Sequence, residues 1–232
     1  MKYRLFFLLF TLLTFSSFCS TASADITFEY FSWTETSTDN YAATAFGIDA
    51  TLNFSTFDAD TGNPVPRNAT NPEFISKYGA SVPAFTMSNG VGGTQALGLS
   101  SITFSQALPA NSILIAFDVD TIRFDEFRFS NTQNPLTFVE QLELVENENS
   151  DFPIWNQAAQ SLISNGVQGN NSEATVLNVE GNSTLNVSFL REAGGSSFGV
   201  SIFAIGVAVP EPTGCFPLVV LAVAISARRK RD

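Results

Sequence analysis

Most side chains of this chain that could do chemistry are carboxylates. The sequence has no histidine, and its only two cysteines, Cys19 and Cys215, lie near the two ends. A Ser-His-Asp triad, a Cys-His pair and a zinc site with histidine or cysteine ligands are therefore excluded for the region between them. Carboxylate, hydroxyl, lysine and tyrosine groups remain for catalysis or binding.

The stretch AFDVDTIRFDEFRFS (116–130) is the most distinctive internal group of carboxylates. Its apolar residues alternate with a period of two, but the phase reverses between Phe124 and Phe127. One extra residue in a strand restores a single apolar face. We therefore expect a bulge or a tight bend at Asp125 and Glu126.

The two carboxylates at this bend have two interpretations. They form an acid/base pair or a cation site, or they are solvated groups balanced by Arg123 and Arg128. We favour the second interpretation, and we interpret Asp118 and Asp120 in the same way, as the polar face of a strand end. We assign no catalytic residue.

The loop DADTGN is a weak candidate for a calcium site. It places the oxygen ligands that calcium prefers on Asp58, Asp60 and Asn63. The loop is not an EF-hand, because it lacks the glycine at position six and the glutamate at position twelve. Aspartate and asparagine are also ordinary turn residues, so we commit to no metal and to no other cofactor.

The first 24 residues have the three parts of a secretory signal peptide. A cationic start, MKYR, precedes an apolar run and the small residues Ala22-Ser23-Ala24. The apolar run from Leu5 to Phe15 has 11 residues, whereas a membrane-spanning helix needs roughly 20. We expect cleavage between Ala24 and Asp25 and export of the remaining chain.

Residues 25–209 are predicted to form one acidic extracellular domain. Of the 22 acidic residues only Glu211 and Asp232 lie outside this span, which leaves 20 acidic and five basic residues and a net charge of −15. Such a surface repels nucleic-acid phosphates and anionic lipid headgroups. We therefore expect no nucleic-acid partner.

The hydrophobic pattern of this domain has mostly the period of strands. In TLNVSFL, for example, Leu185, Val187 and Phe189 alternate with polar residues. Further strands are predicted at 26–33, 45–57, 101–105, 112–120, 136–145, 173–180 and 198–209. The fold class is mainly β: an antiparallel β-sandwich, jelly-roll-like, with about nine or ten strands and one short helix near 151–164.

The last residues, 210–232, form a tail of three parts. Pro210-Glu211-Pro212 is followed by an uncharged segment, 214–227, and by the basic cluster Arg228-Arg229-Lys230-Arg231. As a helix the uncharged segment would be about 21 Å long, short for a hydrocarbon core of about 30 Å. The basic cluster would keep the C-terminus on the cytoplasmic side, and the prolines keep the preceding backbone extended.

This tail resembles the PEP-CTERM sorting signal of Gram-negative bacteria. The resemblance covers about 23 residues, and Cys215 and Pro217 depart from the usual composition of the apolar segment. In that family an exosortase recognises the signal and is thought to cleave near the motif and to release or transfer the protein into the extracellular polysaccharide matrix. The resemblance implies exosortase and secretion machinery as partners, transient anchoring in the inner membrane through 214–227, and a final place at the cell surface or in the matrix.

Three functional classes follow for the domain. We favour a non-enzymatic surface or exopolysaccharide-matrix module. The first alternative is a lectin-like sugar-binding module, which would need exposed rings among Tyr30, Trp33, Tyr41 and Trp155. The second is a glycoside hydrolase or lyase with two carboxylates about 5–9.5 Å apart across a cleft, and no residue pattern selects such a pair.

Overall fold

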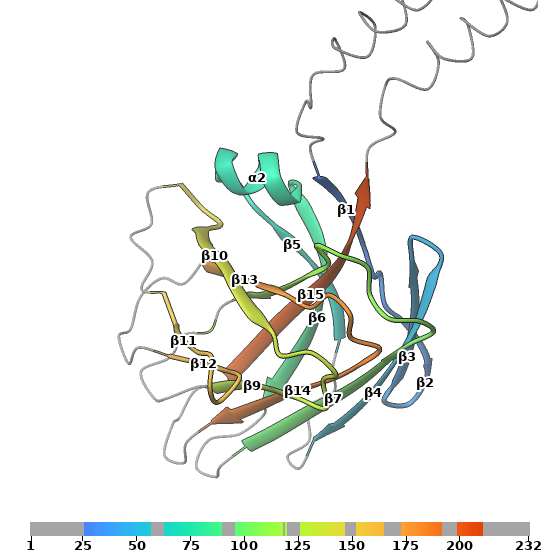
Figure 1. Cartoon of the computed structure of the whole chain (residues 1–232). Helices are drawn as coiled ribbons and strands as arrows, with labels where there is room; N and C mark the ends of the chain where they lie inside the picture. Colours follow the sequence, from blue (N-terminus) through green and yellow to red (C-terminus); the bar gives the residue numbers. More distant parts are fainter. Residues whose placement is uncertain are drawn as a thin grey trace, which may run out of the picture. The chain divides into compact units, whose positions relative to one another are not determined.

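The computed structural model describes residues 26–56, 63–89, 96–117, 119, 126–146, 152–164, 173–191 and 199–210. Residues Phe28–Val209 belong to one compact unit, whose strands form two antiparallel sheets (Figure 1). The mainly β, antiparallel sandwich predicted from the sequence is confirmed.

Sheet A has seven strands. Six lie in the order β10-β13-β8-β15-β6-β5, and β1 pairs with β15 beside this path. Their bounds are β1 Ile26–Tyr30, β5 Asn63–Asn68, β6 Ser81–Asn89, β8 Ile113–Phe117, β10 Thr137–Glu143, β13 Glu173–Asn178 and β15 Gly199–Pro210. Edge strand β5 contains Pro64 and Pro66, which have no N–H to donate and so discourage pairing with another chain.

Sheet B has eight strands in the order β11-β12-β9-β14-β7-β4-β3-β2. Their bounds are β2 Thr34–Ser37, β3 Asn40–Ala45, β4 Ile48–Thr56, β7 Ala96–Phe104, β9 Glu126–Ser130, β11 Ile154–Asn156, β12 Ser161–Ile163 and β14 Thr184–Arg191. The consecutive strands β6 to β10 belong alternately to sheet A and sheet B. The chain therefore crosses repeatedly between the two sheets.

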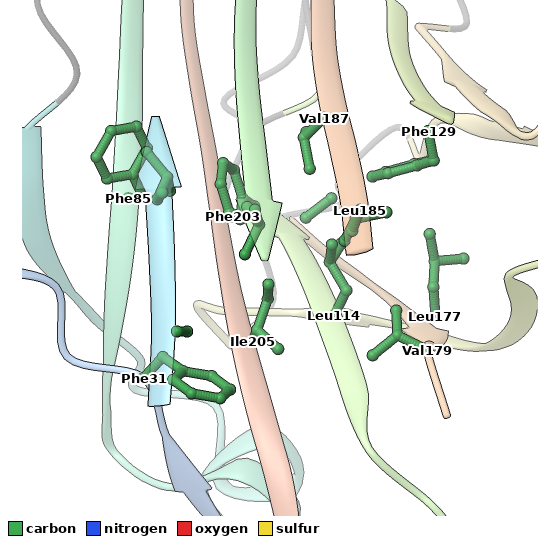
Figure 2. Packing of buried hydrophobic residues seen from close by; sticks show 14 of the residues in the cluster. Phe31, Phe85, Leu114, Phe129, Leu177, Val179, Leu185, Val187, Phe203 and Ile205 are labelled. Carbon is green, nitrogen blue, oxygen red and sulfur yellow. The ribbon is translucent and has the colours of Figure 1, made fainter. Parts of the chain in front are cut away.

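The facing sides of the two sheets form the main hydrophobic core. It contains residues of both sheets, such as Leu185 and Val187 of sheet B and Leu114 and Ile205 of sheet A (Figure 2). In its aromatic part, the Phe85 ring lies 5.7 Å from the Phe203 ring within sheet A and 4.9 Å from the Tyr41 ring of sheet B. Full burial of a side chain of this size stabilises a fold by about 1.5–3 kcal/mol.

Sheet A also buries its outer face. Every residue of β8 is buried, and a second cluster of buried residues includes Ile115, Val176 and Ala204. Helix α2 (Pro72–Tyr78) contributes Phe74 and Tyr78 to this second cluster. Such continuous burial is typical of strands that are covered on both faces.

Helix α2 begins and ends at clear local signals. The side chain of Asn71 accepts a hydrogen bond from Glu73 N–H at the first turn, and Pro72 stands at the first helical position. Gly79 follows the helix with a φ of 99°, a conformation that favours glycine. These signals are present in the sequence, but no helix was predicted at these residues.

Strand β1 contributes to the same cover. The Tyr30 ring lies over Gly206 of β15, where an added Cβ atom would come within 2.9 Å of the ring. The hydroxyl of Tyr30 donates a hydrogen bond to the carbonyl oxygen of Tyr78, at 2.9 Å. Glycine at this position therefore leaves room for the Tyr30 ring to pack on the outer face of sheet A and to bond to the end of α2.

The predicted helix near 151–164 is wrong, because these residues form a hairpin. Strands β11 and β12 pair with each other, and β12 extends sheet B by pairing with β9. Leu162 is thereby buried opposite Phe127, and the Trp155 ring packs 6.0 Å from the Phe129 ring. These long-range contacts outweigh the weak helical pattern of the segment.

The remaining predictions on secondary structure had mixed outcomes. The eight strands predicted between residues 26 and 209 all occur, with ends that differ by several residues, but the described residues form 15 strands rather than nine or ten. No helix of these residues is long and apolar enough to cross a membrane. The apolar segment 214–227 lies outside them.

Candidate binding surface

The outer face of sheet B carries rows of short polar side chains. Residues paired directly across strands lie on one face of the sheet, and the register aligns one residue from each of five neighbouring strands. We call these residues the polar row: Asn40, Asn53, Ser101, Asn186 and Ser130. A second row lies two residues further along these strands. We call it the threonine row, and it consists of Thr51, Thr103 and Thr184.

Hydrogen bonds between strands hold the polar row in place. The Asn53 side chain donates from Nδ2 to Oδ1 of Asn40, at 2.8 Å, and Ser101 Oγ donates to Oδ1 of Asn186, also at 2.8 Å. Asn186 keeps its Nδ2 and Asn53 its Oδ1 without a hydrogen-bond partner in the described part of the chain. Each pair therefore holds one polar group in a fixed position and leaves it available for a further hydrogen bond.

These rows are open to solvent and almost uncharged. Asn53, Thr51 and Thr103 are exposed, and Ser101 and Asn186 are half-buried. The neighbouring rows do carry charge: exposed Asp49 lies two residues from Thr51 on β4 and accepts a hydrogen bond from Thr44. On the other side, the guanidinium of Arg128 lies 3.1 Å from the carboxylate of Glu126. On a domain with a predicted net charge of −15, the polar row and the threonine row themselves contain no charged side chain.

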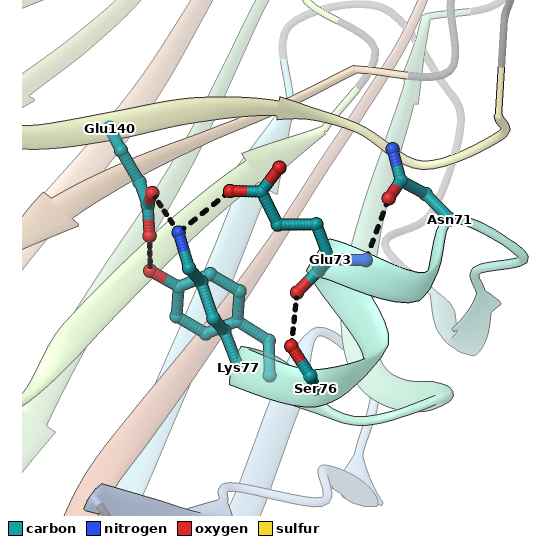
Figure 3. A network of polar contacts seen from close by, with 6 residues as sticks. Asn71, Glu73, Ser76, Lys77 and Glu140 are labelled. Carbon is teal, nitrogen blue, oxygen red and sulfur yellow. Dashed lines mark hydrogen bonds and ion pairs between the residues drawn. The ribbon is translucent and has the colours of Figure 1, made fainter.

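A second polar cluster fastens helix α2 to the edge of sheet A (Figure 3). The Lys77 ammonium lies 3.0 Å from Glu73 on its own helix and 2.6 Å from Glu140 on β10. The other oxygen of Glu140 accepts a hydrogen bond from the hydroxyl of Tyr78. Glu73 and Glu140 are thus two carboxylates that share one cation.

The electrostatics of this cluster suit anchoring rather than catalysis. Burial, with the Glu140 hydrogen bond, raises the pKa of Tyr78 well above its ordinary value. Hydrogen bonds to Glu140 and Glu73 raise the pKa of Lys77. A tyrosine or lysine that acts as a base needs a lowered pKa, so these groups are held in their protonated forms.

The aromatic residues proposed for sugar stacking do not form an exposed platform. Trp33 and Tyr41 are each only 4% exposed and belong to the main core. Tyr30 is half-buried beneath α2, and Trp155 is half-buried against Phe129. The lectin-like prediction therefore loses the stacking surface on which it depended.

Several predicted site residues lie outside the described residues. They are Ala22, Ala24, Asp25, Asp58, Asp60, Asp118, Asp120, Asp125, Glu211, Pro212, Arg228, Arg229, Lys230 and Arg231. Asn63 is the first residue of β5 and Pro210 the last of β15. Glu126 is the first residue of β9 and forms an ion pair with Arg128, as the second interpretation expects. Arg123 and the expected bend before Glu126 lie outside the described residues. No described group of three His, Cys, Asp or Glu side chains could hold a metal ion.

The polar row was not predicted from the sequence. The alternation of Ser, Thr and Asn with apolar residues is visible in 51–55, 99–105 and 184–188. Alternation shows which residues face outward, but the alignment of Asn53 with Ser101 and Asn186 depends on pairing between distant strands. A single sequence does not contain that register.

The fold and this surface define a class: an antiparallel β-sandwich with one covered sheet and one open, polar sheet. Compared with the models of known protein families, with curated proteins and with solved structures, the chain matches none.

Proposed function

We propose that this protein is an exported, non-enzymatic component of the cell surface or exopolysaccharide matrix, delivered by exosortase-dependent sorting. The signal peptide directs it across the inner membrane, and the tail 210–232 holds it there until cleavage. The partners are the secretion machinery and an exosortase, and the domain itself acts as a binding module.

The observation that carries this proposal is where the fold ends. The compact unit reaches Val209, and Pro210 is the last residue of β15. The Pro-Glu-Pro motif therefore begins at the final residue of the last described strand, and residues 211–232 lie outside the described part of the chain. Removal of such a tail leaves every strand up to Val209 in place, as release of a folded domain requires.

The test is the C-terminal sequence of the protein produced from the full chain. We expect an exosortase-bearing Gram-negative host to release a form that ends near Pro210-Glu211-Pro212. In the same host without its exosortase, the tail stays attached and the protein stays with the membrane fraction. Mass spectrometry of the released and membrane fractions measures both.

A matched pair of variants controls for general effects of proline loss. Replacement of both motif prolines, Pro210→Ala and Pro212→Ala, should block release, whereas Pro109→Ala, in the loop between β7 and β8, should not. A released protein that still carries residues 214–231 in the exosortase-bearing host would refute the proposal.

A further inference from the structure

The outer face of sheet B is the part of the molecule best suited to a partner. We infer that the polar row and the threonine row together form a binding surface for a neutral polysaccharide chain lying across the strands. This inference rests on the proposed function, because it names the partner class of the exported module.

The chemistry of the face favours a neutral, hydroxyl-rich ligand. The two rows consist of amide and hydroxyl side chains and contain no charged residue. Sugar hydroxyls both donate and accept hydrogen bonds, as these side chains do. An anionic polymer would be repelled by the acidic domain, and a cationic one would find no carboxylate in these rows.

The same face is poorly suited to a protein partner. The centres of protein interfaces are enriched in aromatic residues, methionine and arginine, and neither row contains any of these. A nucleic acid is disfavoured by charge. Among macromolecules of the matrix, a neutral polysaccharide is the one that the face can bind without a desolvated charge.

The geometry favours a polymer over a single sugar. Strands in a sheet are about 4.8 Å apart, so the five residues of the polar row extend over about 19 Å, with the threonine row about 7 Å beside it. Exposed hydrogen bonds each contribute little, and no described aromatic ring stacks over either row. Many weak contacts repeated along a chain give useful binding through effective concentration.

Binding is measured with the protein purified from whichever fraction of the host contains it. The probes are insoluble cellulose and cross-linked dextran as neutral glucans, alginate as a polyanion, and short glucose oligomers. We expect sedimentation with one or both neutral glucans, persistence of binding in 1 M salt because no ion pair is involved, and no measurable binding to alginate or to the short oligomers.

The decisive variant is the triple substitution Asn53→Ala, Ser101→Ala and Asn186→Ala. We expect binding to weaken at least tenfold, because each net hydrogen bond is worth a factor of about two to ten. The matched control replaces three exposed residues of the other half of the sandwich, Ser76→Ala, Ser81→Ala and Thr137→Ala, and should bind as the unchanged protein does.

A second variant guards against a folding defect in the first. The double substitution Thr51→Val and Thr103→Val keeps the β-branched shape and the strand propensity, so it should leave the melting temperature unchanged and still weaken binding severalfold. The inference is overturned if neither neutral glucan is bound, if both face variants bind like the control, or if salt abolishes binding. Because location is measured separately, a protein that is never released but binds glucan through this face refutes only the proposed function.

Discussion

The two sheets of this sandwich use similar inner faces and opposite outer faces. Sheet A buries its outer face under α2 and the aromatic residues of β1, so that Ile115 and Val176 are as inaccessible as the main core. Sheet B leaves its outer face open, with Thr51, Asn53 and Thr103 in solvent. The cover on one sheet adds stability, and its absence on the other leaves a broad polar surface exposed to solvent.

One outer face adds buried apolar surface and the other keeps polar groups exposed, and a single face cannot do both. A covered face supplies the apolar burial that a domain without disulfides between its ordered strands needs. An open face must instead keep its polar groups fixed, which the bonds between Asn40 and Asn53 and between Ser101 and Asn186 achieve. The following predictions test this division, beginning with the largest expected effect.

Insertion of one carboxylate into each outer face tests the division most severely. Val176→Asp places an unpaired charge in a fully buried site, and we expect a loss of more than about 4 kcal/mol of unfolding free energy. Asn53→Asp has nearly the same shape on the open face and should cost less than about 1 kcal/mol. Urea denaturation of the two variants measures both values, and equal losses would contradict the comparison.

Removal of the buried Phe74 side chain of α2 should expose the outer face of sheet A to solvent. Phe74 is fully buried and its ring lies 6.3 Å from that of Phe117 on β8. We expect Phe74→Ala to cost about 3–5 kcal/mol and to increase binding of a hydrophobic dye. Ser76→Ala on the exposed side of the same helix is the control, and it should change stability by less than about 0.5 kcal/mol.

Alkaline pH should loosen the covered sheet before the open one. Burial raises the pKa of Tyr30 and of Tyr78 above the ordinary value, so the folded state favours their neutral forms. Their contribution is fully present below the unfolded pKa of about 10 and is lost as pH rises toward the folded-state pKa. The raised pKa of Lys77 acts in the same direction.

The urea midpoint of the unchanged protein should therefore fall between pH 9 and 11. In Tyr78→Phe the fall should be smaller, although the midpoint at pH 7 is lower because the hydrogen bond to Glu140 is lost. An alkaline loss of the same size in both proteins would show that the cover of sheet A does not depend on this hydroxyl.

The smallest expected effect lies in the loop that follows β13. The backbone N–H of Asn111 and the amide of Asn178 donate hydrogen bonds to Glu180 and lower the pKa of its carboxyl group. A lowered pKa gives stability above the unfolded value of about 4.5 that is lost as pH falls through the folded value. Melting curves from pH 6 to 3 should show a slightly weaker acid dependence for Glu180→Gln than for the unchanged protein. Equal acid dependence of the two proteins would show that Glu180 makes no such contribution.

The parts of the fold that the sequence predicted are those in which burial alternates along one strand. In β14, Leu185, Val187 and Phe189 are buried and the residues between them are not. The sequence of this segment alone is therefore enough to predict which of its residues face the core. The hairpin of β11 and β12 could not be predicted this way, because its strands have three residues each and depend on β9. Edge strand β5 was also not predicted, because Pro64 and Pro66 are residues that usually argue against a strand.

The candidate surface was less predictable than the fold. Each of its strands shows outward-facing polar residues, which is common to any open antiparallel sheet. Its distinguishing property is that the two aligned rows on β4, β7 and β14 contain no charged residue, and this depends on the register between residues such as Asn53 and Asn186, far apart in the sequence. The covered face depends in the same way on the docking of α2.

The contrast between the two outer faces is tested most directly by the accessibility of single cysteines. The span 25–209 contains no cysteine, so Val176→Cys and Thr103→Cys can each be introduced into a full chain in which Cys19 and Cys215 are replaced by serine. We predict that the thiol at position 103 reacts with maleimide at nearly the rate of a free thiol, whereas that at position 176 reacts only after unfolding. Comparable labelling rates at the two positions in the native protein would contradict the account.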